Sequence, residues 1–148
     1  MSLAKWAEYG WLKQEAASPD EIQGLLSIVD RGLRDAQVEG ISTDLRFIAV
    51  FNSALAAATT ALRANGYRTA TQTGHHVKTI ESLEFTLPVD RKLIQKFKVL
   101  SNKRNRSSYD VAGAVSDEDL QSMMKLANEL QNELQGWLRK EHPELLGP

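Results

Sequence analysis

The stretch that decides the fold is STDLRFIAVFNSALAAATTALRANG, residues 42–66. Its apolar side chains recur every three or four residues, which is the spacing of one face of an α-helix: Leu45, Ile48, Phe51, Leu55, Ala58 and Leu62. Ser42 or Thr43 can cap the start of this helix, and Asn65-Gly66 is a favoured left-handed helix end. Alanines on the other faces let neighbours approach closely on several sides. The sequence therefore predicts the central helix of a bundle here.

Two other long helices are predicted from their start signals. In Ser18-Pro19-Asp20-Glu21 the serine hydroxyl can accept from the amide of Glu21, and the glutamate can reach back to the serine. The stripe that follows ends near Gly40 and consists of Ile22, Leu25, Leu26, Val29, Leu33 and Ala36. Ser116 opens the last helix, where acidic residues suit the helix dipole. Its stripe consists of Leu120, Met123, Ala127, Leu130, Leu134, Trp137 and Leu138.

The remaining segments complete an all-α pattern. A shorter helix with Val77, Ile80, Leu83 and Leu87 precedes Pro88, and a basic helix begins near Asp90. No alternating run is long enough to predict a strand. We expect a single domain over residues 1–148, an antiparallel up-and-down bundle of about five or six helices with its core at about 19–140.

Composition limits the class of protein and its location. Hydrophobic residues make up 42% and charged residues 25%, as in ordinary globular domains. There is no cysteine, and His75-His76 lack the spacing of a zinc-binding pair, so the sequence predicts no metal site and no cofactor. No apolar run approaches the roughly 20 residues of a membrane helix, and the N-terminus lacks a signal-peptide core. We expect a cytoplasmic protein without membrane association.

Charge is distributed unevenly along the chain. Seven basic residues and no acidic residue lie between Arg91 and Tyr109, although the net charge of the whole chain is −1. The rest of the chain carries 11 basic and 19 acidic residues. A cationic strip on an acidic body is typical of a local anion site. The alternative is a solvated basic helix end that complements the helix dipole, and composition by itself favours that interpretation.

The strip ends in KRNRSSYD, residues 103–110, where Arg104 is the most informative residue. It continues the buried stripe of the basic helix, which consists of Leu93, Phe97 and Leu100. An arginine in line with core residues is costly to bury without a partner, so we expect it to face a groove, a carboxylate or a subunit interface. Its guanidinium suits a phosphate, and Asp44 or Asp110 could orient it.

The chain resembles the HEPN family (higher eukaryotes and prokaryotes nucleotide-binding domain). The resemblance lies in KRNRSSYD, in NGYRTATQTGHHVKTIESL (residues 65–83) and in the helix pattern from about Pro19 to Trp137. The family signature is an arginine, often followed by asparagine, and a histidine after four to six residues. The resemblance implies a dimeric bundle with the motif near the dimer interface. Many members are metal-independent endoribonucleases of toxin–antitoxin and defence systems, and others bind substrate for separate nucleotidyltransferases.

The chain departs from the signature at Tyr109, which stands where histidine is expected. In an active member the arginine would stabilise the transition state while the histidine transfers protons. Tyrosine has an ordinary pKa of about 10, so only about one phenol in a thousand is ionised at pH 7. We therefore expect a domain that binds RNA or a nucleotide phosphate, with weak or no cleavage.

The predicted site has two groups of residues. Arg104 and Tyr109 are the candidate catalytic residues, and the candidate ligand-binding residues are Lys103, Asn105, Arg106, Ser108 and Asp110. We expect a homodimer. The alternative is a non-catalytic partner of an antitoxin or of a separate nucleotidyltransferase.

Overall fold

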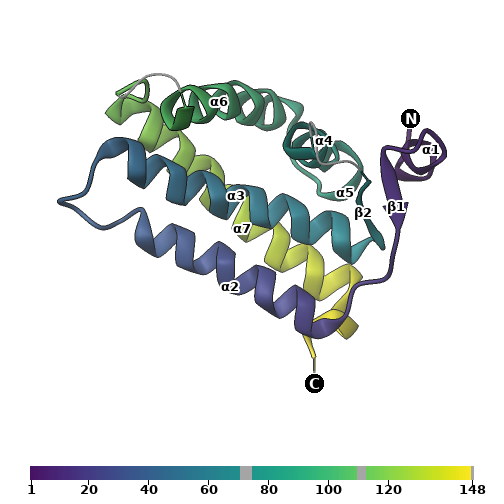
Figure 1. Ribbon diagram of the computed structural model, residues 1–148. Coiled ribbons are helices and arrows are strands. Elements are labelled where there is room, and N and C mark those ends of the chain that lie inside the picture. Colours follow the sequence, from purple (N-terminus) through teal and green to yellow (C-terminus); the bar gives the residue numbers. More distant parts are fainter. Residues whose placement is uncertain (71–74, 110–112, 148) are drawn as a thin grey trace.

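The computed structural model describes residues 1–70, 75–109 and 113–147, with residues 75 and 106–109 described by their backbone. Its elements in chain order are α1 (Leu3–Glu8), β1 (Leu12–Gln14), α2 (Pro19–Asp35), α3 (Thr43–Ala64), β2 (Tyr67–Thr69), α4 (His75–Glu81), α5 (Leu83–Thr86), α6 (Arg91–Tyr109), α7 (Asp117–Glu141) and a 3-10 turn (Pro143–Leu146). Helices make up 73% of the structure (Figure 1), so the predicted all-α bundle is confirmed.

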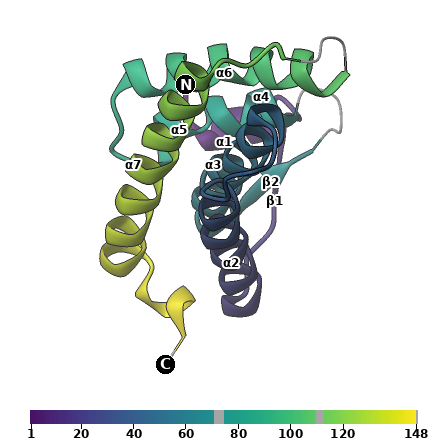
Figure 2. The same ribbon diagram turned by 90° about the vertical axis from the view of Figure 1, so that its left-hand side faces the viewer.

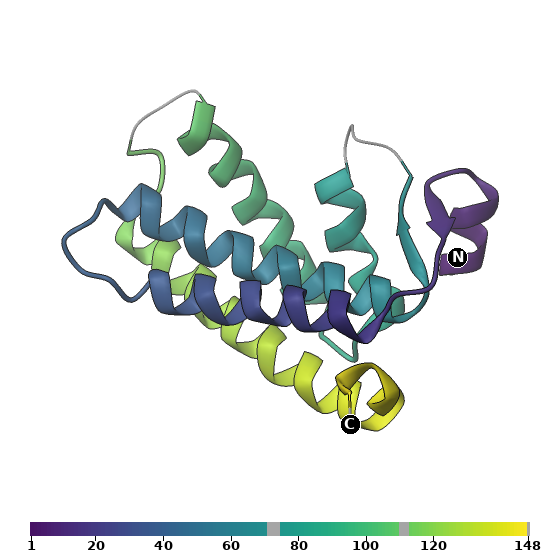
Figure 3. The ribbon, with the colours of Figure 1, turned by 60° about the horizontal axis from the view of Figure 1, so that its bottom comes forward.

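The long helices alternate in direction along the chain. Helices α2 and α3 lie side by side as an antiparallel hairpin, α7 packs against α3, and α6 lies over the top of this group (Figures 1 and 2). Figure 3 shows the same hairpin from below, with both ends of the chain on the side where α2 begins and α3 ends. Because the helices alternate in direction, the end of α6 and the starts of α3 and α7 lie at the same end of the bundle.

Helix α3 is the centre of the core, as its sequence predicts. The rings of Phe47 and Phe51 stack with centroids 6.4 Å apart, and the ring of Phe97 on α6 meets Phe51 edge-on at 5.6 Å. The predicted stripe is wrong at its first position, because the side chain of Leu45 is 53% exposed. The neighbouring side chains of this turn are partly buried, and Thr43 donates to the Asp117 carboxylate at the start of α7 at 3.0 Å, so Leu45 lies on the uncovered side of the turn.

The small residues of α3 allow a close crossing with α2. A Cβ atom added to Gly32 would lie 2.7 Å from both the Ala49 carbonyl oxygen and the Ser53 Cβ. At the same crossing the buried Ser53 hydroxyl donates to the Val29 carbonyl at 2.6 Å. The alanine-rich faces therefore bring the two backbones together, as predicted.

The predicted helix starts are confirmed at Ser18, Ser42 and Ser116, whose hydroxyls accept from backbone amides. Ser116 and Asp119 form a complete reciprocal capping box. Glu21 does not return to Ser18, because its carboxylate binds Arg63 instead. Helix α2 ends at Asp35, five residues before the predicted Gly40, since Gln37 and Val38 already bond as turns.

Three expectations about local structure are wrong. Residues 12–14 and 67–69 form a short antiparallel sheet, with Lys13 opposite Arg68, where the sequence predicts no strand. The helix before Pro88 is broken into α4 and α5 at Ser82, whose hydroxyl donates to the Thr79 carbonyl at 2.6 Å. Val77, a predicted core residue of this helix, is 45% exposed.

Among the residues that the structure describes, one helix is long and apolar enough to cross a membrane, although the sequence has no continuous apolar run of that length. It is α3, with a mean hydropathy of 1.5 over an 18-residue window, of which 61% is buried inside the bundle. The core helix of a bundle meets the same criterion, and α3 occupies that position here.

Candidate functional site

Arg104 lies one and a half turns before the end of α6, on the side of the helix that faces α3. Its guanidinium carbon is 5.6 Å from the centre of the Phe51 ring, within the range of a cation–π contact. The side chain is half-buried. Its Nε–H is buried and has no hydrogen-bond acceptor among the residues that the structure describes. The predicted position of Arg104, in line with Phe97 and Leu100, is therefore consistent with this contact.

No carboxylate neutralises Arg104 within the described part of the chain. Asp44, one of the two residues expected to orient it, accepts from the Gly113 amide at 2.8 Å through Oδ2. Its Oδ1 is buried and has no donor among the described residues. The other, Asp110, lies outside the described residues. Within the described residues, a guanidinium N–H of Arg104 on α6 and a carboxylate oxygen of Asp44 on α3 are thus unpaired, at the same end of the bundle.

Lys103 has a structural role that the sequence does not predict. Its ammonium group binds the Asp119 carboxylate on α7 at 2.8 Å, which ties the end of α6 to the start of α7. Burial of Asp119 works against ionisation, but hydrogen bonds from Lys103 and Ser116 outweigh it and lower the pKa of this carboxyl. The positive charge of Lys103 is therefore largely used within the fold.

The other predicted site residues are less closely defined. Asn105 is exposed at the end of α6. Arg106, Ser108 and Tyr109 belong to the last turn of α6, and Asp110 lies outside the described residues. The expected roles of all five side chains stay predictions.

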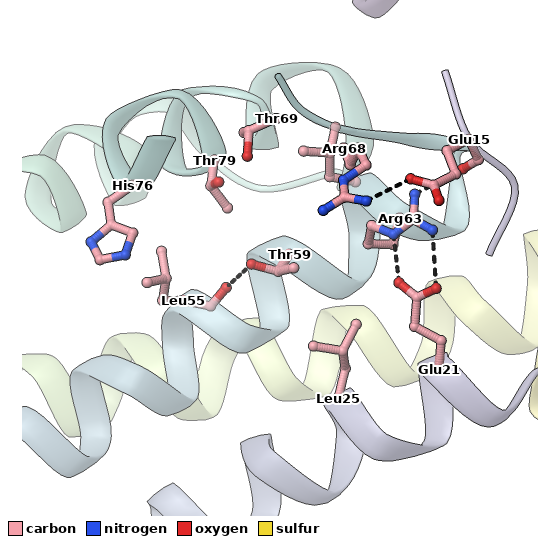
Figure 4. A pocket seen from close by; sticks show the side chains of 11 residues that line it. Glu15, Glu21, Leu25, Leu55, Thr59, Arg63, Arg68, Thr69, His76 and Thr79 are labelled. Atoms are coloured by element: carbon pink, nitrogen blue, oxygen red, sulfur yellow. Dashed lines mark hydrogen bonds and ion pairs between the residues drawn. The ribbon is translucent and has the colours of Figure 1, made fainter. Parts of the chain in front are cut away.

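The sequence does not predict a pocket of about 510 Å³ at the opposite end of α3, between α2, β2 and α4 (Figure 4). It is lined by Glu15, Glu21, Leu25, Leu55, Thr59, Leu62, Arg63, Arg68, Thr69, His76 and Thr79. Thr59 donates to the Leu55 carbonyl at 2.8 Å, so its hydroxyl hydrogen is already used within α3. His76 and Thr79 also interact with other residues.

Arg63 is the most strongly bound polar group of this pocket. Its Nε and Nη2 donate to the two oxygens of Glu21, and its other N–H groups donate to the carbonyls of Glu15, Ala16 and Tyr67. The hydrogen bond with Arg63 lowers the pKa of Glu21 and raises the pKa of Arg63. With all five N–H groups bound, Arg63 joins the N-terminal segment, α2 and β2 and has no donor left for a ligand.

No protein-family model, curated protein or solved structure matches this chain. The candidate site therefore depends on the residues and geometry of this molecule, and Arg104 is its best-supported member.

Proposed function

We propose that this chain is a HEPN-like domain that binds RNA or a nucleotide phosphate at the C-terminal end of α6, with weak or no cleavage. The observation that carries the proposal is the half-buried guanidinium of Arg104, whose Nε–H has no acceptor among the described residues. Elsewhere the chain satisfies its buried arginine completely, since every N–H group of Arg63 has an acceptor.

A phosphate group supplies what Arg104 lacks. A buried donor without a partner costs about 1–3 kcal/mol, and more when it is charged. The face of Phe51 offers the cation only a weak, non-hydrogen-bonding contact. Two oxygens of a phosphate group accept from two N–H groups of one guanidinium in a planar, bidentate arrangement. Rotation of the side chain toward the helix end would exchange the ring contact for that pair of bonds.

The same chemistry limits cleavage. Arg104 could stabilise negative charge that develops on a phosphate as a ribose 2′-hydroxyl attacks it. A general base is also required, and Tyr109 would serve poorly, because its ordinary pKa of about 10 leaves it protonated at pH 7. Binding without efficient turnover follows from this combination.

The test is RNA binding and cleavage by the purified protein in EDTA, with Arg104→Ala and Tyr109→Phe variants. Arg91→Ala is the matched control, because Arg91 is an exposed arginine on the same helix and is paired with Glu84 at 3.0 Å. We expect Arg104→Ala to weaken RNA binding at least tenfold while Arg91→Ala changes it less than twofold. Equal affinity of the Arg104 and Arg91 variants would refute the proposal. Cleavage lost in both the Arg104 and Tyr109 variants would instead establish a metal-independent nuclease.

A second candidate function, contact with a protein partner or a second copy of the chain, is favoured by apolar side chains at the same end of the bundle. Val38 and Ile41 in the α2–α3 connection and Leu45 in α3 are 50%, 39% and 53% exposed. Sedimentation of the purified protein, with a Leu45→Glu variant, tests the homodimer directly. A wild-type dimer that Leu45→Glu dissociates would support a dimer interface at this end of the bundle. A wild-type protein that is monomeric at micromolar concentration would refute the homodimer.

A further inference from the structure

The basic residues of α6 fall into two groups according to their partners. Three of them form ion pairs: Arg91 with Glu84 at 3.0 Å, Lys98 with Glu81 at 3.1 Å, and Lys103 with Asp119 at 2.8 Å. Lys92 and Lys96 are exposed, and neither forms an ion pair with a described residue. Lys92 and Lys96 are one turn apart and so lie on one face of α6, whereas Arg104, which also has no carboxylate partner in the described residues, faces Phe51 of α3.

That face borders a groove between α6 and α7 with a volume of about 450 Å³. Lys92 and Lys96 line one wall, and Lys125 of α7, which is also without an ion pair in the described part of the chain, lines the other. Ser122 and two leucines complete the surface together with Asp90 and Glu129. Asp90 is used within the fold, since its Oδ1 accepts from the Lys92 amide at 2.9 Å. The groove carries a net charge of +1 on this count.

The arrangement is unfavourable for α6 itself. Lys92 lies in the first turn, which has no acidic residue, and the helix dipole disfavours a cation there. Lys92 and Lys96 are also like charges one turn apart, which repel each other on a helix surface. Arg91, Lys98 and Lys103 of α6 are paired with carboxylates, but Lys92 and Lys96 of α6 and Lys125 of α7 form no ion pair with a described residue. A bound polyanion would be attracted to all three unpaired lysines.

The groove leads toward Arg104. Lys92, Lys96 and Lys103 share one side of α6 at spacings of four and seven residues, so this row covers about 16 Å of helix. The Lys103–Asp119 bond lies in the same seam between α6 and α7, beyond Ser122. A strand in the groove would therefore run along α6 to the helix end where Arg104 is located.

We propose that the groove between α6 and α7 binds the sugar-phosphate backbone of single-stranded RNA and guides the strand to Arg104. This inference rests on the proposed function and narrows it from a nucleotide phosphate to an extended strand. None of the residues that line the groove is aromatic, so no ring is available to stack on bases. Binding along the groove depends on phosphate contacts and is independent of sequence.

The test compares two triple variants that remove the same charge. The groove variant is Lys92→Gln/Lys96→Gln/Lys125→Gln, and the control is Lys5→Gln/Lys13→Gln/Lys140→Gln, whose lysines lie on α1, β1 and the C-terminal end of α7. The probes are a fluorescein-labelled 12-nucleotide RNA and the corresponding trinucleotide. Affinity is measured by fluorescence anisotropy from 50 to 300 mM KCl.

We expect the groove variant to reduce the salt dependence, the slope of log K against log [KCl], by about 2, because each phosphate contact with a single strand contributes about 0.7. The control leaves the slope unchanged. Wild-type protein binds the 12-mer more tightly than the trinucleotide, and the groove variant abolishes this preference. Glu129→Gln removes the one groove carboxylate that has no partner in the described part of the chain, and it tightens binding of the 12-mer.

Equal slopes for the groove and control variants would overturn the inference. Arg104→Ala, measured with both probes, separates this failure from that of the proposed function. If Arg104→Ala abolishes trinucleotide binding and the groove variant does not change RNA binding, Arg104 is a phosphate-binding site and the groove does not bind the strand. A groove effect with Arg104→Ala unchanged would leave an RNA-binding surface and refute the role of Arg104.

Discussion

Replacement of Arg63 by glutamine should destabilise the fold more than any other single change at an ion pair among the described residues. The arginine side chain is 8% exposed and its Glu21 partner 39% exposed. The change removes the charge that faces Glu21 and leaves the carbonyls of Glu15, Ala16 and Tyr67 with fewer donors. The bonds of Arg63 tie the N-terminal segment, α2 and β2 to α3, so all three connections weaken together.

The magnitude follows from the burial of the pair. Breaking a buried ion pair by removing one partner costs about 3–5 kcal/mol, but exposed pairs contribute about 0–1 kcal/mol. Because Glu21 is partly exposed, we expect a loss of about 2–3 kcal/mol in the free energy of unfolding. For a domain of this size that loss lowers the Tm by about 4–12 °C.

The assay is thermal unfolding followed by circular dichroism, from pH 7 to pH 2.5. The pKa of Glu21 is lowered in the folded protein by its hydrogen bond with Arg63. A carboxyl with a lowered folded-state pKa stabilises the fold above its unfolded pKa and loses that contribution as the pH falls through its folded pKa. The difference in Tm between wild type and Arg63→Gln should therefore shrink below about pH 4.5, the ordinary value for this carboxyl.

The control is Arg68→Gln, whose exposed pair with Glu15 lines the same pocket. We expect a change of less than about 1 kcal/mol for this variant. If Arg63→Gln and Arg68→Gln lower the Tm equally, or if the Arg63 effect is the same at pH 7 and pH 3, the assignment of Arg63 as the central tie of this end of the bundle is incorrect.

Three other predictions follow from the packing and charges. Gly32→Ala should destabilise the protein by about 1–3 kcal/mol in urea unfolding, because the added Cβ would overlap α3. Gly24→Ala, whose added Cβ would have nothing within 4 Å, should stabilise the protein by about 0.5–1 kcal/mol. Equal effects of the two changes would show that α2 and α3 do not cross this closely. Asp119→Asn should lower the free energy of unfolding at neutral pH and have little effect in acid. The lowered pKa of Asp119 means that its side chain stabilises the fold only when it is ionised. Parallel urea titrations of the wild type and the variant at pH 7 and pH 3 test whether the difference disappears in acid. Arg104→Met should abolish RNA binding but leave the midpoint of urea unfolding unchanged or raise it, because the change removes a buried donor that has no acceptor in the described residues. A loss of more than about 1 kcal/mol in the free energy of unfolding would instead indicate that Arg104 has a structural role.

Much of the site's location follows from helical spacing. Arg104 continues the row of Phe97 and Leu100, and in the structure it meets Phe51 of α3. The strip of cations in α6 is likewise visible in the sequence. What spacing does not reveal is which charges are neutralised. Lys103 is bound to Asp119, 16 residues away on another helix, while Lys96 has no such partner in the described residues.

The sequence missed Arg63 and the small sheet for a related reason. Strands β1 and β2 are three residues each and more than 50 residues apart, too short for any alternating pattern. Arg63 appears as a charge at the end of an apolar helix, and its partner Glu21 as half of a capping box. An arginine on an otherwise buried alanine-rich face was the available signal, because such a residue needs acceptors from elsewhere in the chain.

By itself the sequence determined the local elements: the helix starts at Ser18, Ser42 and Ser116, the central position of α3, and the cationic character of α6. These depend on interactions within a few residues, such as caps and apolar periodicity. The tertiary structure alone decided the pairing of charges, the break between α4 and α5 and the exposure of Leu45. Each of these depends on which segments meet, and an ion pair or a covered face requires a partner that local spacing cannot specify.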